Sequence, residues 1–243
     1  MFLSRLILNP MSRAVQRDLS DCQQMHRTLC KAFDQHPERD PAFRANVGLL
    51  WRVDSSREGI PLVLVQTRVK PEWSFLECLP GYLLDDGRMN PGLRSLEPLL
   101  EQVREGALFR FCLRANPTKK IDTLSKPDEK HRNGRRIPLI GEKNEISWLY
   151  GKATAHGFEI LKHDNVEGLP LVPAVRIIRE PHSCGKRTDS EGKKHLTFHA
   201  VRFEGCLRVT NKGSFISALK GGIGSAKAYG FGLLSVVPIK PWH

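Results

Sequence analysis

Apolar and polar residues alternate along many short stretches of this chain, beginning with FLSRLIL at residues 2–8. A period of two places successive side chains on opposite faces of an extended backbone, so each stretch predicts a strand. We expect strands at 2–8, 47–53, 61–67, 108–116, 158–161, 172–179, 196–202, 207–210 and 233–239.

Helical spacing is clearest between the first two predicted strands. Ser20 and Gln23 form an S-x-x-Q pattern, which predicts a capping box at a helix N-terminus. The apolar residues of this helix recur at Cys22, Met25, Leu29, Ala32 and Phe33. Further short helices are expected at 71–79, 142–150 and 214–220.

Each half of the chain therefore reads β-α-β-β followed by a further helix and strand, which is the ferredoxin-like pattern. We expect an α+β fold of two tandem ferredoxin-like (RRM-like) domains with antiparallel sheets. The first domain would span residues 1–90 and the second 106–243, joined by a linker region at 91–105.

Charge is the unusual feature of the composition. The 243 residues include 38 Lys and Arg against 26 Asp and Glu, a formal net charge of +12. This excess predicts a polyanionic partner, nucleic acid first and an acidic membrane surface second. Two segments concentrate the charge, a loop at 119–136 and a flexible hairpin at 176–194, and both would follow phosphates without reading bases.

The apolar runs and the cysteines indicate in which cellular compartment the protein is found. No run approaches the roughly 20 apolar residues of a membrane span, and the N-terminus lacks the features of a signal peptide. The six cysteines are scattered and form no C-x-x-C pair, so we expect reduced thiols, no metal site and a cytoplasmic protein.

The segment 221–235, GGIGSAKAYGFGLLS, has five glycines around Lys227. Glycine permits positive φ and close approach, so freed N–H groups of Gly222 and Gly224 with Lys227 could hold phosphate oxygens. The residues fit neither the P-loop nor the dinucleotide-binding fingerprint. A flexible turn before an edge strand is the alternative interpretation.

His26 is the histidine whose position favours chemistry. It falls at the shoulder of the buried stripe of its helix, where an imidazole is half-buried but reachable by solvent. Arg27 and Lys31 lie on the adjoining face. Cations nearby favour the neutral imidazole, which can act as a base, and they can stabilise negative charge on phosphorus.

Together these segments resemble a known family. FLSRLILNP, SRAVQRDL, MHRTLCKAF, FRFCLRANP, RIPLI, FEGCLRV and GGIGSAKAYGFGLLSV occur in the order and spacing of the CasE family. These are CRISPR-associated endoribonucleases that process repeat RNA in type I-E systems. The resemblance covers essentially the whole chain and implies two ferredoxin-like domains.

The resemblance also implies metal-independent cleavage of a CRISPR repeat at the 3′ base of its hairpin, without a cofactor. The product guide RNA would stay bound, and the protein would join the other subunits of the Cascade complex. Family matching identifies His26 and Lys31 as catalytic residues. Gln23 occupies a position that is often tyrosine in the family, so a tyrosine role is in doubt.

We expect RNA contacts from basic and glycine residues of several segments: Arg13, Arg27, Lys119, Lys120, Arg135, Arg136, Arg179, Lys186, Arg187, Lys193, Lys194, Gly222, Gly224 and Lys227. Two alternatives remain open. The first is a non-catalytic RNA-hairpin-binding subunit of a CRISPR ribonucleoprotein. This alternative stays open because Gln23 stands where the family often has a tyrosine. The second is a small-molecule enzyme that uses the glycine-rich segment as a nucleotide site.

Overall fold

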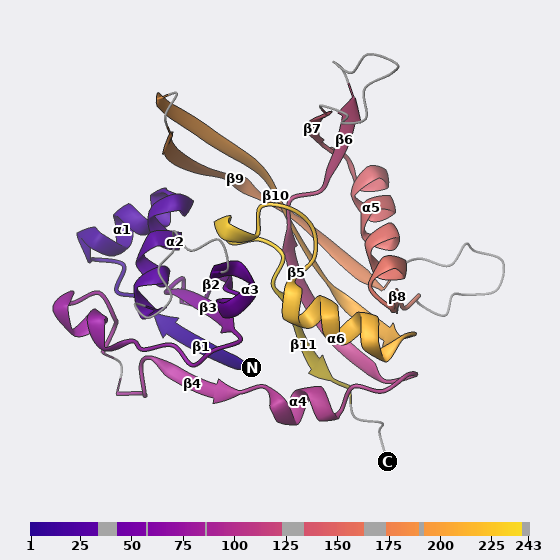
Figure 1. Cartoon of the computed structure of the whole chain (residues 1–243), viewed down its shortest axis with the longest axis horizontal. Helices are drawn as coiled ribbons and strands as arrows, with labels where there is room; N and C mark the ends of the chain where they lie inside the picture. Colours follow the sequence, from indigo (N-terminus) through magenta and orange to yellow (C-terminus); the bar gives the residue numbers. More distant parts are fainter. Residues whose placement is uncertain are drawn as a thin grey trace.

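The computed structural model describes residues 1–33, 43–56, 58–85, 87–122, 134–162, 174–189 and 192–239. Within these ranges the chain forms two antiparallel sheets side by side, with helices packed on each, and a separate two-stranded ribbon (Figure 1). The first half of the chain builds one sheet and the second half builds the other.

The first sheet has the order β2-β3-β1-β4 and is antiparallel throughout. Its strands are β1 (Phe2–Ile7), β2 (Leu50–Ser55), β3 (Pro61–Thr67) and β4 (Gly92–Ser95). Its helical elements are α1 (Arg13–Ser20), α2 (Cys22–Cys30), η1 (Lys31–Phe33), α3 (Phe43–Val47) and the 3₁₀ turn η2 (Ser74–Cys78). Met25 and Leu29 of α2 pack in one buried core with Trp51, Val63 and Val65 of the sheet, as the helical spacing predicts.

The second sheet repeats this arrangement in the order β11-β5-β10-β8, with β9 paired along β10. Its strands are β5 (Leu108–Ala115), β8 (Phe158–Ile160), β9 (Val175–Asp189), β10 (Gly192–Val209) and β11 (Leu234–Pro238), and its helices are α5 (Glu142–Ala155) and α6 (Lys212–Gly221). Trp148 of α5 stacks on Phe203 of β10, and Phe215 of α6 packs against Phe109 and Phe158. Two tandem ferredoxin-like domains with antiparallel sheets are therefore confirmed.

The start of the helix that carries His26 differs from the prediction. Asp21, not Ser20, is its N-cap, and the Asp21 carboxylate accepts hydrogen bonds from the N–H groups of Gln23 and Gln24 at 2.9 and 3.4 Å. Ser20 ends α1, where its hydroxyl donates to the carbonyl of Arg17. The predicted capping box is wrong, because the serine hydroxyl serves the preceding helix.

Two predicted loops are more regular than expected. The basic loop at 119–136 begins and ends in strands β6 (Thr118–Asp122) and β7 (Gly134–Pro138), which pair with each other. We call this pair the ribbon; residues 123–133 lie outside the described ranges. The basic segment at 176–194 forms a hairpin, as predicted, and belongs to the paired strands β9 and β10, whose register shifts between Phe198 and Ala200.

Beyond the reach of β5, residues 183–189 pair with residues 192–198, and we call the segments 181–189 and 192–198 the arm. In Figure 1 the arm extends over α1 and α2. The expected linker at 91–105 contains β4 and the short helix α4 (Glu97–Glu101). Because β4 pairs with β1, residues 92–95 belong to the first sheet; the exact domain boundaries stay a prediction.

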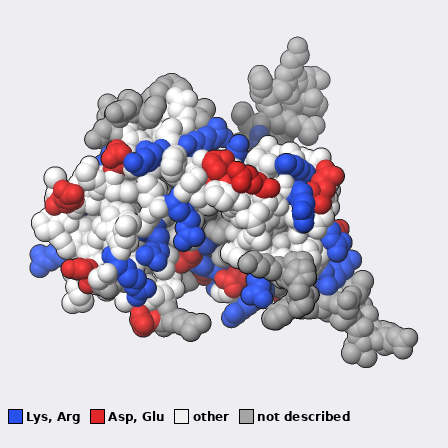
Figure 2. Space-filling model, turned by 90° about the horizontal axis from the view of Figure 1, so that it is seen from below, with Lys and Arg blue, Asp and Glu red and all other residues white. Residues whose placement is uncertain are grey.

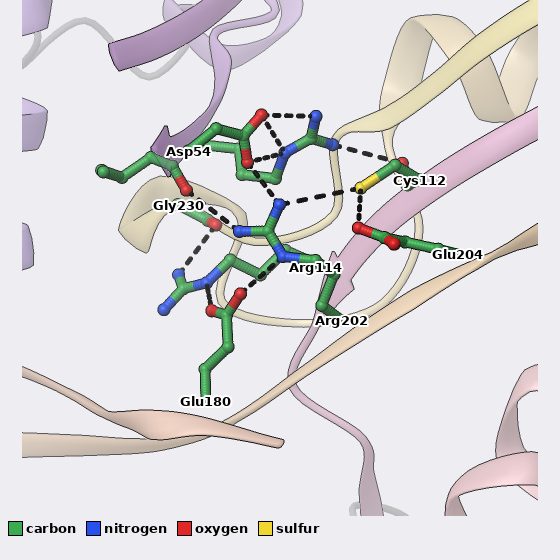
Figure 3. Close-up of polar contacts among 9 residues, drawn as sticks. Asp54, Cys112, Arg114, Glu180, Arg202, Glu204 and Gly230 are labelled. Atoms are coloured by element: carbon green, nitrogen blue, oxygen red, sulfur yellow. Dashed lines mark hydrogen bonds and ion pairs between the residues drawn. The ribbon is translucent and has the colours of Figure 1, made fainter. Parts of the chain in front are cut away.

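Ion pairs connect the two sheets (Figure 3). Asp54 of β2 accepts from Arg52 of the same strand at 2.8 Å and from Arg202 of β10 at 2.5 Å. Glu180 of β9 accepts from both Arg202 and Arg114, at 2.6 and 2.5 Å. Burial alone would raise the pKa of both carboxyls, but these guanidinium groups outweigh burial and hold each pKa below its usual value.

Basic side chains lie on both halves of the molecule and where the halves meet, with acidic side chains among them (Figure 2). None of the helices in the described part of the chain combines the length and the apolarity that a membrane span requires.

Candidate active site

A cleft of about 560 Å³ opens where the two domains meet, and His26 lines it. One wall comes from α2 and from residues 43–50 with Arg68, all of the first domain. The opposite wall is the glycine-rich segment at 220–229 of the second domain. The shoulder position predicted for His26 is therefore a position at a domain interface, and its side chain is half-buried there.

The His26 imidazole contacts a cysteine on its own helix. The Sγ of Cys30, one turn later, lies 3.7 Å from Nε2 and 4.0 Å from Nδ1. The helix itself is fixed at its N-terminus, because the Asp21 carboxylate also accepts the backbone N–H of Lys186 in the arm at 3.3 Å. Gly185 lies against Cys22 so closely that a Cβ would come within 2.8 Å of the Cys22 sulfur. The arm thus sets the position of the helix that carries His26.

Of the described residues, three cations line the cleft: Arg68, Lys220 and Lys227. Arg27 and Lys31 are exposed and are not among the described residues that line it. Arg68 and Lys220 were not predicted, since they lie 42 and 194 positions after His26 (68 − 26 and 220 − 26) and only the fold brings them near it. No local motif in the sequence marks either residue.

The glycine-rich segment is a packed loop. Gly222, Gly224 and Gly230 have φ of +70°, +88° and +82°. A Cβ at Gly222 would lie 2.8 Å from Leu50, and one at Gly230 would lie 2.8 Å from the Trp51 ring. Close packing against the first domain therefore explains the glycines better than the flexible turn does, although β11 is the expected edge strand.

Lys227 is partly engaged within this loop. Its Nζ donates to the carbonyl of Gly221 at 2.6 Å. Burial, with a smaller contribution from Lys152, lowers the pKa of Lys227. An ammonium group has three N–H donors, so this bond leaves it able to donate to a phosphate oxygen. Its predicted phosphate contact stays a prediction.

Comparison with known proteins identifies the family. Residues 1–238 match a family model described as CRISPR associated protein. The chain is 34% identical to CRISPR-associated endoribonuclease Cse3 of Thermus thermophilus, over 98% of this chain and all of that one. It is 29% identical to CRISPR system Cascade subunit CasE of Escherichia coli K12, again over 98% and 100%. A structure of Cse3 bound to a 19-nucleotide RNA superposes with a TM-score of 0.76 at 33% identity, covering 98% of this chain and 100% of that one.

This chain belongs to the CRISPR-associated protein family. The resemblance found in its motifs is confirmed. In this CRISPR-associated protein the remaining predicted RNA contacts fall into three places. Lys119, Lys120 and Arg136 lie exposed on the ribbon, Lys186 and Lys194 lie exposed on the arm, and Arg13 lies on α1 beside Gly81, away from the cleft.

The other predicted RNA contacts either bind a carboxylate of the protein or have side chains that the structure does not describe. The Arg179 guanidinium binds the fully buried carboxylate of Glu145, with its shortest contact at 2.9 Å. Arg135, Arg187 and Lys193 lie in strands, but their side chains are outside what the structure describes. In the described ranges, no three His, Cys, Asp or Glu side chains converge as metal ligands would.

Proposed function

We propose that this CRISPR-associated protein is an endoribonuclease that cuts CRISPR precursor RNA at the 3′ base of the repeat hairpin. It then stays bound to the guide RNA as a cytoplasmic subunit of Cascade. The observation that carries the proposal is His26 in a cleft between the domains, lined by cations from both. A proton-transfer group beside positive charge is what cleavage of a phosphodiester requires.

The reaction uses the nucleophile that RNA itself contains. The 2′-OH beside the scissile phosphate attacks phosphorus, and the 5′ oxygen of the next nucleotide leaves. His26 removes the 2′-OH proton or protonates the leaving oxygen, which is worth about 10²–10⁴ in rate. The products are a 2′,3′-cyclic phosphate (or a 3′-phosphate) and a 5′-OH. No step needs a metal-bound water, so the reaction is metal-independent.

Positive charge stabilises the crowded phosphorane that forms during attack. Arg68, Lys220 and Lys227 line the cleft and could supply this charge, and the exposed Lys31 of η1 is the cation that family matching assigns to the role. Gln23 is buried and has no ionisable proton, so His26 and these cations act without a residue of the tyrosine type at position 23.

Cleavage of an end-labelled repeat hairpin in excess EDTA tests the proposal. Wild type should cut once, while His26→Ala and an RNA with a 2′-deoxy sugar at the cut should be inert but still form a complex. Comparing Lys31→Ala with Arg68→Ala, each with full binding curves, shows which cation acts in the transition state. If wild type binds the cognate hairpin tightly and never cuts it, the protein is a binding subunit.

A further inference from the structure

A second cleft adjoins the first on the far side of the glycine-rich loop. It encloses about 440 Å³ between the ribbon, the base of the arm and this loop, and we call it the ribbon cleft. Ser225, Ala226 and Tyr229 line both clefts, so they form a shared wall. Ala226 has φ of +60° and is the one non-glycine residue with positive φ in the described ranges. Strained backbone of this kind concentrates at binding and catalytic sites.

Flat rings form one side of the ribbon cleft. Tyr229 stacks on Phe198 with ring centroids 4.9 Å apart and an interplanar angle of 24°. The exposed ring of His182 stands edge-on to His199 at 6.0 Å. Rings that are held by other rings offer a preformed stacking surface for a nucleobase, and such stacking tolerates any base.

Polar groups line the same cleft. The hydroxyl of Thr118 lies 3.3 Å from that of Ser225, and Ser225 donates to the carbonyl of Asn116. Arg136 reaches the same threonine at 3.4 Å. No Asp or Glu is among the described residues that line this cleft, so its charge favours an anion.

Hydrogen bonds to Glu145 hold one side of the ribbon cleft in place. His199 lies at the irregularity in β10, where a bulge redirects a side chain, and its Nε2 is 3.0 Å from the Glu145 carboxylate. Arg179 binds both oxygens of the same carboxylate. Burial raises the pKa of Glu145, but hydrogen bonds from Arg179 and His199 outweigh burial and keep the pKa below its usual value. The acid is thus neutralised beneath the cleft and does not repel an anion.

We infer that the ribbon cleft binds the first unpaired nucleotide on the 3′ side of the scissile phosphate. This inference rests on the proposed function. If the cut lies at the 3′ base of the hairpin, the nucleotide before it belongs to the stem and the next nucleotide is unpaired. A base stacked on Tyr229 or His182, with its phosphate beside Arg136, would continue the strand from the His26 cleft across the shared wall. The enzyme gains this contact in the substrate and loses it when the 3′ fragment leaves.

Two uncleavable RNAs test the inference. Both carry a 2′-deoxy sugar at the cut, one ends there with a 3′-phosphate, and the other continues for three nucleotides. Wild type should bind the extended RNA about tenfold more tightly, as one stacked base predicts. His182→Ala and Arg136→Gln should bring this ratio close to one. His195→Ala, an exposed histidine on the arm outside the cleft, should leave the ratio unchanged.

The ratio of the two affinities is insensitive to folding defects and to lost contacts with the stem, because these weaken the binding of both RNAs equally. A ratio of one in wild type, or a ratio unchanged by both His182→Ala and Arg136→Gln, overturns the inference. Failure of the proposed function looks different, since wild type would then fail to bind the truncated hairpin or to cut an all-ribose repeat.

Discussion

The indole N–H of Trp51, on β2 of the first sheet, donates a 3.2 Å hydrogen bond to the carbonyl of Ala228 in the glycine-rich loop of the second domain. The ring of the same tryptophan closes over Gly230. Each wall of the His26 cleft is therefore held against the other by direct contact, and the geometry of the site depends on that contact.

Gly230→Ala should destabilise the protein and lower cleavage. The new Cβ would meet the Trp51 ring at 2.8 Å in a backbone of φ +82°, which costs about 2–4 kcal/mol from strain and overlap together. Gly106→Ala is the matched control, since Gly106 has φ of +80° with no atom within 4 Å of a Cβ. In urea unfolding, the control should lose less free energy of unfolding than Gly230→Ala. Equal losses would contradict a role for packing against Trp51.

Asp54→Asn should destabilise the domain interface strongly. Removing this charge leaves the buried Arg52 without a carboxylate partner and leaves Arg202 with Glu180 alone, and breaking a largely buried pair in this way costs up to about 3–5 kcal/mol. The exposed pair of Glu159 and Arg208 offers the control, because Glu159→Gln should cost no more than about 1 kcal/mol. Chemical denaturation of both variants compares them, and similar losses would argue against the network.

Acid should release this same network. The pKa values of Asp54 and Glu180 are lowered in the folded protein, so their stabilisation is present above the pKa of the unfolded carboxyls, near 4. It is lost as the pH falls through the lower folded values. Unfolding free energy measured from pH 6 to pH 2.5 should therefore fall less steeply in Asp54→Asn than in wild type. Parallel curves would show that Asp54 is not the group responsible.

Asp21→Ala should affect both stability and catalysis. It removes the cap of the helix that carries His26, for about 1 kcal/mol, and also the acceptor of the Lys186 N–H in the arm. Asn211→Ala removes the equivalent cap of α6, where the side chain accepts from the Ser214 N–H at 2.9 Å. Asp21→Ala should lose at least as much stability as Asn211→Ala, while single-turnover cleavage slows only in Asp21→Ala. Unchanged cleavage there would show that the cap does not position His26.

Lys227→Met should reduce the salt dependence of RNA binding. If its ammonium contacts one phosphate, the slope of log K against log salt should become shallower by about 0.7–0.9. Lys143→Met, an exposed lysine on α5 outside the cleft, should leave the slope unchanged. A lower affinity with an unchanged slope would mean that Lys227 only supports the loop through Gly221.

Much of the fold was predictable because the periodicity of the side chains reflects burial directly. Met25 and Leu29 of the helical stripe lie in the first core, and so do the inward-facing residues of the alternating segment 61–67. The strand order follows from the ferredoxin pattern. The capping residue was not predictable, because Ser20 and Asp21 are both good caps and the choice depends on where α1 ends.

The candidate site was predictable only in part. His26 could be predicted because it lies at the edge of the apolar stripe of its own helix. Arg68 and Lys220 line the cleft because the two domains dock against each other, and no local sequence pattern encodes that docking. For Arg179 the sequence predicted an RNA contact because of its charge, but the guanidinium forms an ion pair with Glu145. The sequence alone cannot show that this carboxylate is buried.

The irregularity in β10 lies where the arm leaves the second sheet. On one side of it β10 pairs with β9 alone, and on the other it pairs with both β9 and β5. His199 and Arg179 fasten this junction to α5 through Glu145, while Asp21 fastens the arm to α2 further along. The arm thus contacts the rest of the molecule at two points, Glu145 of α5 at its base and Asp21 of α2 further along. Because Asp21 also caps the helix of His26, a change in the position of the arm is coupled to a change in the position of that helix.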